Sequence, residues 1–134
     1  MSRYTPEIIE KIWQKATIVN GYDPEKYRKD NCDAWICRDD YNNHNSDFGW
    51  EIDHIYPQSL LERANVPQEL IDSTDNLRAM NWRNNESKAD DYPVYHACVS
   101  SEDNKNKIKD ADYRIAETIQ ERIKNLYEEY VSEL

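Results

Sequence analysis

Asp53 and His54 place a carboxylate beside an imidazole at the end of an apolar segment. They follow Gly-Trp-Glu-Ile and precede a bend at Pro57. Carboxylate oxygens bind hard cations, and a histidine accepts a proton near neutral pH. Adjacent side chains of a strand point to opposite faces, so both groups reach one cleft only where the strand ends and the chain turns. We expect this pair to form half of a site.

A second polar segment supplies the other half of the predicted site. Residues 75–88 read Asp-Asn-Leu-Arg-Ala-Met-Asn-Trp-Arg-Asn-Asn-Glu-Ser-Lys. If the end of this segment is helical, Asn85 and Lys88 lie three residues apart and face the same cleft. A carboxylate and an amide oxygen, with no soft ligand nearby, favour Mg²⁺ or Mn²⁺ over zinc.

Short strands and helices must position these residues. Strands are expected at about residues 34–38 and 48–53, and the turn formers between them predict a β-hairpin with a long loop. Further along the chain the composition indicates a helix over 67–71, an extended piece over 77–80, a helix over 82–89, and a strand or loop over 95–101.

Helices are expected at both ends of the chain. Thr5-Pro6-Glu7 combines an N-cap, an N1 proline and a first-turn acid, which predicts a helical segment over 5–30. An apolar stripe at three- and four-residue steps predicts a long helix over about 107–134, packed on the domain or forming a dimer seam. We therefore predict an α+β fold in a single domain, 1–134, with a motif core over about 34–91.

The polar blocks, in this order and spacing, resemble the HNH endonuclease motif of the ββα-metal (His-Me finger) fold. The blocks are Asp53-His54, then Asn76-Leu77, then Asn85-x-x-Lys88. The sequence Asp-His-Ile-x-Pro-Gln-Ser is similar to that in the HNH domain of RNA-guided CRISPR nucleases. The sequence leading into the first block and the acidic exit after the last one resemble small standalone bacterial and phage HNH proteins. The matched segment runs from about residue 50 to 90, less than a third of the chain.

The resemblance implies a role for each matched residue. Asp53 would ligate a single catalytic metal ion, and Asn85 would be the second ligand in place of the family's last histidine. His54 would be the general base that deprotonates the attacking water. Asn76 would tie the loop to the strand through backbone hydrogen bonds. The fold implied is a ββα-metal core with a β-hairpin and a catalytic helix, flanked by N- and C-terminal helices.

The resemblance also implies a substrate and its contacts. The substrate would be DNA, whose phosphodiester bonds are hydrolysed with Mg²⁺ or Mn²⁺. Lys88 would act at the catalytic site and meet phosphate oxygens, and Arg83 and Arg78 would add to the nucleic-acid contacts. Many family members carry paired C-x-x-C motifs that bind a bracing zinc; this chain lacks them, so no structural zinc is expected.

The charge of the chain restricts how it could hold nucleic acid. Its 134 residues include 17 Lys and Arg against 27 Asp and Glu, a net charge of −10. Proteins that bind DNA by phosphate neutralisation are usually basic. We therefore expect weak non-specific DNA binding, a strong dependence on divalent metal, and a protein partner that supplies DNA affinity or targeting.

The remaining composition favours a cytoplasmic protein. No apolar stretch approaches the length of a membrane span, and the start of the chain lacks a signal-peptide pattern. Three cysteines are an odd number without such a signal, and we read them as free thiols.

Two other hypotheses stay open at this point. One is a non-catalytic module that binds nucleic acid or protein on a degenerate HNH scaffold. The other, which the acidity disfavours, is a toxin nuclease neutralised by a partner.

Overall fold

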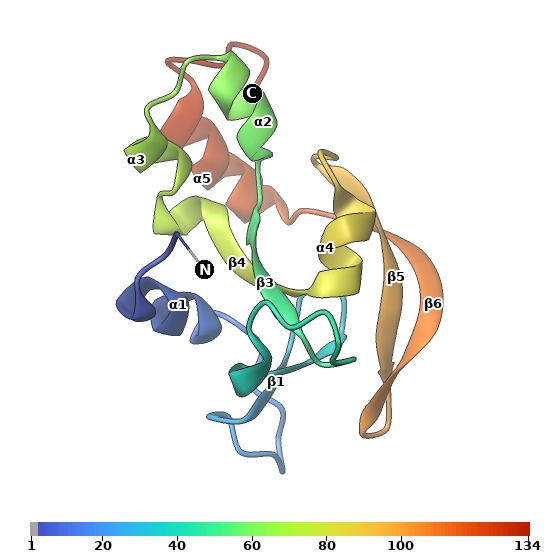
Figure 1. The fold of residues 1–134 in the computed structure, drawn as a ribbon. Coiled ribbons are helices and arrows are strands. Elements are labelled where there is room, and N and C mark those ends of the chain that lie inside the picture. Colours follow the sequence, from blue (N-terminus) through green and yellow to red (C-terminus); the bar gives the residue numbers. More distant parts are fainter. Residues whose placement is uncertain (1–2) are drawn as a thin grey trace.

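The chain folds into an α+β structure in which short antiparallel strand pairs alternate with helices. The computed structural model describes residues 3–134 (Figure 1). In these residues the elements are α1 (Pro6–Trp13), β1 (Tyr27–Lys29), β2 (Trp35–Cys37), β3 (Trp50–His54), α2 (Gln58–Arg63), α3 (Gln68–Ile71), β4 (Leu77–Asn81), α4 (Trp82–Lys88), β5 (Val94–Glu102), β6 (Lys105–Arg114) and α5 (Glu117–Tyr127), with 3₁₀ turns at Arg38–Asp40 and Thr74–Asn76.

The centre of the molecule is the antiparallel pair β3 and β4, followed without a linker by α4. The register runs from Trp50 opposite Asn81 to His54 opposite Leu77. Asn81 ends β4 and also caps α4, because its side-chain oxygen accepts a hydrogen bond from the Arg83 amide at 3.0 Å. This continuity fixes α4 relative to both strands.

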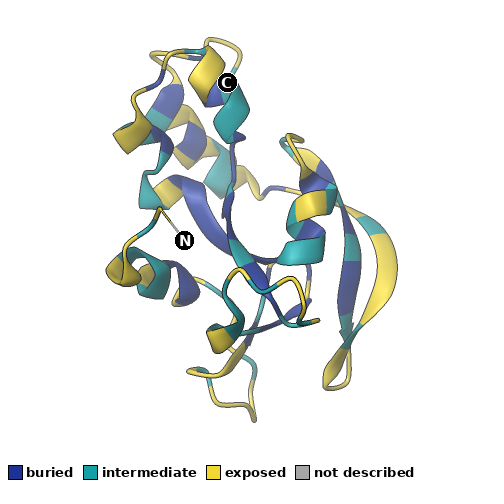
Figure 2. Ribbon diagram, in the orientation of Figure 1, coloured by how far each residue is buried: buried dark blue, intermediate teal, exposed yellow. Residues whose placement is uncertain are grey.

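Apolar side chains form two clusters on either side of this centre. One lies between α1 and the β3–β4 pair and includes Trp13, Trp50 and Leu77. The other joins α2, α3, α5 and β5, with Leu61 and Tyr127 among its buried members. Figure 2 shows the buried residues concentrated on β3, β4 and the inner part of β5, while β6 is mostly exposed.

Gly49, just before β3, is required by close packing. A Cβ atom there would lie 2.0 Å from the Asn43 carbonyl oxygen and 2.9 Å from Trp82. The loop before β3 therefore fits against the start of α4 only because this position carries no side chain.

The strands predicted at 34–38 and 48–53 exist, but the hairpin predicted between them is wrong. β2 pairs with β1, and β3 pairs with β4. The turn formers between 39 and 47 instead make a loop that returns beside β3, with an isolated parallel bridge from Tyr41 to Trp50. Local turn composition does not identify the partner of a strand, which depends on side-chain burial across the whole fold.

The terminal helices are shorter than predicted. α1 begins at Pro6 with Thr5 as its cap, as expected, but ends at Trp13, and β1 occupies part of the segment predicted as helical. The first part of the helix predicted over 107–134 is wrong, because Lys105–Arg114 is strand β6, paired with β5 across a turn at Asp103 and Asn104. The helices predicted at 67–71 and 82–89 and the extended piece at 77–80 are confirmed.

Within residues 3–134, none of the helices has the length and apolar character needed to cross a bilayer.

Candidate functional site

Asp53, His54 and Asn85 line one hollow of about 260 Å³ at the end of β3. The first two come from the last residues of β3, and Asn85 comes from the middle of α4. Pro57 and Gln58, from the turn after β3, also line the hollow. The structure therefore brings together three of the residues singled out from the sequence.

Asp53 is buried and lies between two cations. Its Oδ2 accepts a hydrogen bond from Arg78 Nε at 2.9 Å, and its Oδ1 lies 3.4 Å from Lys88 Nζ. Arg78 is directly opposite Asp53 in the β3–β4 register, and Lys88 is one turn beyond Asn85 on α4. The Oδ1 contact is longer than an ordinary hydrogen bond, so this oxygen is less fully occupied than Oδ2.

The cations predicted to meet phosphate divide into two kinds. Lys88 is fully buried and also donates to the His54 carbonyl oxygen at 3.1 Å. Burial lowers the pKa of its ammonium group, while the negative charge of Asp53 acts to raise it. Arg78 is 6% exposed, whereas the side chain of Arg83 is 40% exposed and pairs with Asp47 at 3.1 Å. In this structure Arg78 and Lys88 therefore act on Asp53, and Arg83 is the accessible member of the set.

The imidazole of His54 is held by three polar side chains. Its Nε2 lies 2.8 Å from Asp72 Oδ1, 3.2 Å from Arg3 Nη2 and 3.3 Å from the Tyr4 hydroxyl. Burial lowers the pKa of the imidazole below its ordinary value, while the hydrogen bond and charge of Asp72 act to raise it. A largely neutral imidazole at neutral pH is able to accept a proton.

Asn76 is buried and bridges the backbone of the turn after β3. Its Oδ1 accepts from the Tyr56 amide at 2.7 Å, and its Nδ2 donates to the Tyr56 carbonyl at 3.1 Å and to the Ile71 carbonyl at 3.3 Å. The resemblance implies that this asparagine ties the loop to the strand; its partners here are Tyr56, two residues after β3, and Ile71, the last residue of α3. These hydrogen bonds fix the chain direction immediately after His54.

Asn85 is oriented by an acidic side chain. Its Nδ2 donates to Glu51 Oε1 at 3.0 Å, and Glu51 Oε2 lies 2.7 Å from His44 Nε2. Because the amide nitrogen is used by Glu51, the Asn85 Oδ1 oxygen is left to accept a donor or a cation.

The donor set at the hollow is suited to a hard divalent cation. In the part of the chain that the structure describes, no three His, Cys, Asp or Glu side chains gather as a metal-binding group. Asp53 Oδ1 and Asn85 Oδ1 remain as oxygen donors, and Mg²⁺ commonly keeps several water ligands beside one or two protein oxygens. The chemistry of these two oxygens suits a magnesium-type ion, and Lys88, 3.4 Å from Asp53 Oδ1, competes with such an ion at Asp53.

Several residues of this site were not found from the sequence. Asp72 and Arg3 reach His54 from segments 18 and 51 residues away, and nothing in local spacing connects them to it. Glu51 had a signal, since it precedes Asp53 by two residues and lies on the same face of β3.

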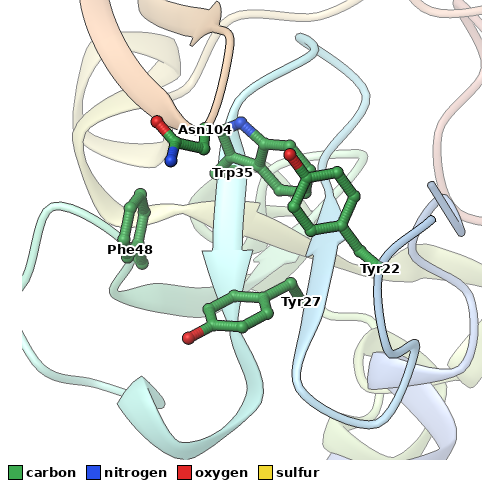
Figure 3. Close-up of a pocket in the computed structure, with 5 residues that line it drawn as sticks. All are labelled: Tyr22, Tyr27, Trp35, Phe48 and Asn104. Carbon is green, nitrogen blue, oxygen red and sulfur yellow. The ribbon is translucent and has the colours of Figure 1, made fainter. Parts of the chain in front are cut away.

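A separate hollow of about 210 Å³ lies near the opposite end of β3. Figure 3 shows the five side chains that line it: Tyr22, Tyr27, Trp35, Phe48 and Asn104. It shares no lining residue with the hollow of Asp53 and His54.

Comparison of the chain with protein-family models, with curated proteins and with solved structures finds no match.

Proposed function

We propose that the protein is a metal-dependent HNH-type endonuclease that hydrolyses DNA phosphodiester bonds. The observation that carries the proposal is that Asp53, His54 and Asn85 line one hollow. Their order in the chain and their positions at a strand end and on the following helix agree with the motif that the sequence resembles. The proposed core is accordingly a ββα-metal unit made of β3, β4 and α4.

In the proposed reaction, a water molecule attacks the phosphorus atom and the bond to the leaving sugar oxygen breaks. His54 takes the proton of the attacking water, which requires a neutral imidazole. A divalent cation, when bound at Asp53 and Asn85, supplies positive charge to the phosphate oxygens. Glu51 orients the Asn85 amide, and Asn76 holds the turn that carries His54 at the hollow.

The buried cations have an indirect part in this proposal. Arg78 and Lys88 hold the Asp53 carboxylate in place and offset its negative charge. A metal ion is therefore attracted less strongly to Asp53, and the negative phosphate of the substrate is needed to help bind it. Arg83, on the exposed side of α4, is the proposed contact to the DNA backbone.

Plasmid nicking tests the proposal. Supercoiled DNA is incubated with the protein in Mg²⁺, Mn²⁺ or EDTA, beside the His54→Ala variant and a matched control, His96→Ala, on β5. We expect nicking that needs metal, is reduced by about 10²–10⁴-fold in His54→Ala and is unchanged in the control. Absence of nicking in every metal, or equal nicking by His54→Ala, would contradict the proposal.

One observation favours the alternative of a non-catalytic binding module on the same scaffold. Asp53 is enclosed by two cations, and a carboxylate so paired binds a metal ion less readily. On this alternative the protein would bind nucleic acid or protein equally well in EDTA and in Mg²⁺. Fluorescence anisotropy with labelled DNA in the two buffers separates the hypotheses.

A further inference from the structure

The Nε2 atom of His54 has three polar neighbours that make conflicting demands on its proton. Arg3 Nη2 lies 3.2 Å away, the Tyr4 hydroxyl 3.3 Å away and Asp72 Oδ1 2.8 Å away. A guanidinium has no acceptor, so it bonds Nε2 only when that nitrogen carries no hydrogen. A carboxylate bonds Nε2 only when the hydrogen is present. One neutral tautomer satisfies Asp72, and the other satisfies Arg3.

The remaining hydrogen bonds favour the tautomer that satisfies Asp72. Arg3 Nη2 donates to Asp72 Oδ1 at 2.7 Å and also to the Gln58 side-chain oxygen, so it has acceptors without the histidine. With hydrogen on Nε2, both His54 and Arg3 direct donors at the same carboxylate oxygen. With hydrogen on Nδ1 instead, a lone pair would face a carboxylate at 2.8 Å, which is repulsive.

Asp72 is itself held in a fixed position. It follows the last residue of α3, and its second oxygen accepts a hydrogen bond from Gln68 Nε2 at 2.9 Å. Its side chain is 23% exposed and that of His54 is 13% exposed, so water competes only partly for the contact. A charge-assisted hydrogen bond in such surroundings is stronger than one in open solvent.

We infer that Asp72 is the positioning residue of His54, holding hydrogen on Nε2 and leaving Nδ1 to accept the proton of the attacking water. The tautomer itself stands on the contacts above, whereas its part in cleavage rests on the proposed function. When Nδ1 takes up the proton, Asp72 stabilises the imidazolium that forms, without itself becoming protonated.

Nitrogen NMR of the histidine rings tests the tautomer directly. The protein is labelled with ¹⁵N-histidine and studied in EDTA at about pH 8, where an imidazole of ordinary pKa is largely neutral. A His54→Gln variant identifies the His54 signals. We expect the Nε2–H tautomer in the wild-type protein and a shift toward Nδ1–H in Asp72→Asn. The Glu69→Gln control removes an exposed carboxylate from the same short helix and should leave the signals unchanged.

Cleavage kinetics provide the second readout. We expect Asp72→Asn to lower kcat by at least about tenfold, a part of the 10²–10⁴-fold that a general base contributes in total. KM and the unfolding temperature should stay close to those of Glu69→Gln. A wild-type Nδ1–H tautomer, an unchanged tautomer in Asp72→Asn, or full cleavage by that variant would overturn the inference. Absence of cleavage by the wild-type protein in every metal would overturn the proposed function, while the NMR result would still decide the tautomer.

Discussion

Asp53 balances two buried cations, Arg78 and Lys88, through contacts of 2.9 and 3.4 Å. Removal of its charge would leave both cations buried without a counter-ion. We expect Asp53→Asn to lower the free energy of unfolding by about 3–5 kcal/mol, measured by urea denaturation without metal. The control Asp91→Asn, at an exposed position, should change it by less than about 0.5 kcal/mol. A small change in the free energy of unfolding of Asp53→Asn would mean that the buried cations do not need the Asp53 charge.

Two adjacent asparagines of α4 should separate stability from activity. Asn84 is buried, donates to the Val99 carbonyl at 3.0 Å and to Asp30 at 3.2 Å, and accepts from the Val99 amide. Asn85 contacts Glu51 at the hollow. We expect Asn84→Ala to cost more than about 2 kcal/mol in the free energy of unfolding, since several buried groups lose their partners. Asn85→Ala should cost under about 1 kcal/mol and abolish metal-dependent nicking.

The reverse pattern, with Asn85→Ala unfolding the protein or Asn84→Ala leaving it as stable as the wild type, would contradict this assignment. Thermal unfolding and plasmid nicking on the same two preparations supply both measurements.

At the residue scale, the sequence allowed prediction of those site residues that local spacing brings together. Asp53, His54 and Asn85 could be selected because a strand end and a helical repeat bring them near one another. Asp72 and Arg3 could not, since they meet His54 only through the packing of distant segments. The same packing buried Lys88, for which the family resemblance implies a contact with phosphate oxygens.

At the element scale, β6 shows how one apolar pattern fits two structures. Residues 105–114 pair with β5, and Ile108 is 76% exposed, although the helical stripe placed it in the core. We expect Ile108→Lys to change the free energy of unfolding by less than about 0.5 kcal/mol. Ile123→Ala, at a fully buried position of α5, should cost about 2–5 kcal/mol. Chemical denaturation compares the two, and a large loss at Ile108 would favour the helix instead.

The strand could have been recognised from its turn. Glu102 pairs with Lys105, so Asp103 and Asn104 form a two-residue connection, and Asp103 has a φ of 53°. Residues that accept a positive φ are typical of tight hairpins. Of the helix predicted over 107–134, only Glu117–Tyr127 is helical, and its extension back to Ile108 rested on periodicity without a test for a hairpin. Short strands such as β3 and β4 were predictable, but their pairing was not.

At the scale of the whole molecule, a buried thiol and a half-buried phenol that stay protonated should lower the stability of the fold at alkaline pH. Burial raises the pKa of Cys32 from 9.0 to about 12, and burial raises that of Tyr4 from 10.0 to about 12. Above about pH 9 the unfolded chain therefore releases protons that the folded chain retains, so stability falls as the pH rises.

We expect the urea midpoint to decrease steadily between about pH 8 and pH 10.5, with a shallower decrease in Cys32→Ala. A midpoint that stays constant across this range would show that these groups are already accessible in the folded protein.

If the proposed function holds, the enclosed group of Asp53, Arg78 and Lys88 affects how fast DNA associates with the protein. Its charges sum to one positive unit, inside a chain whose net charge is −10. At long range the net negative charge of the protein thus repels DNA, whereas near the site the positive group attracts it. Raising the ionic strength from about 0.01 to 0.15 M shortens the screening length from about 30 to 8 Å and weakens mainly the repulsion. Stopped-flow association in Mg²⁺ should therefore become faster with added salt, the opposite of what basic DNA-binding proteins do, and a steep slowing would show that other cations guide the approach.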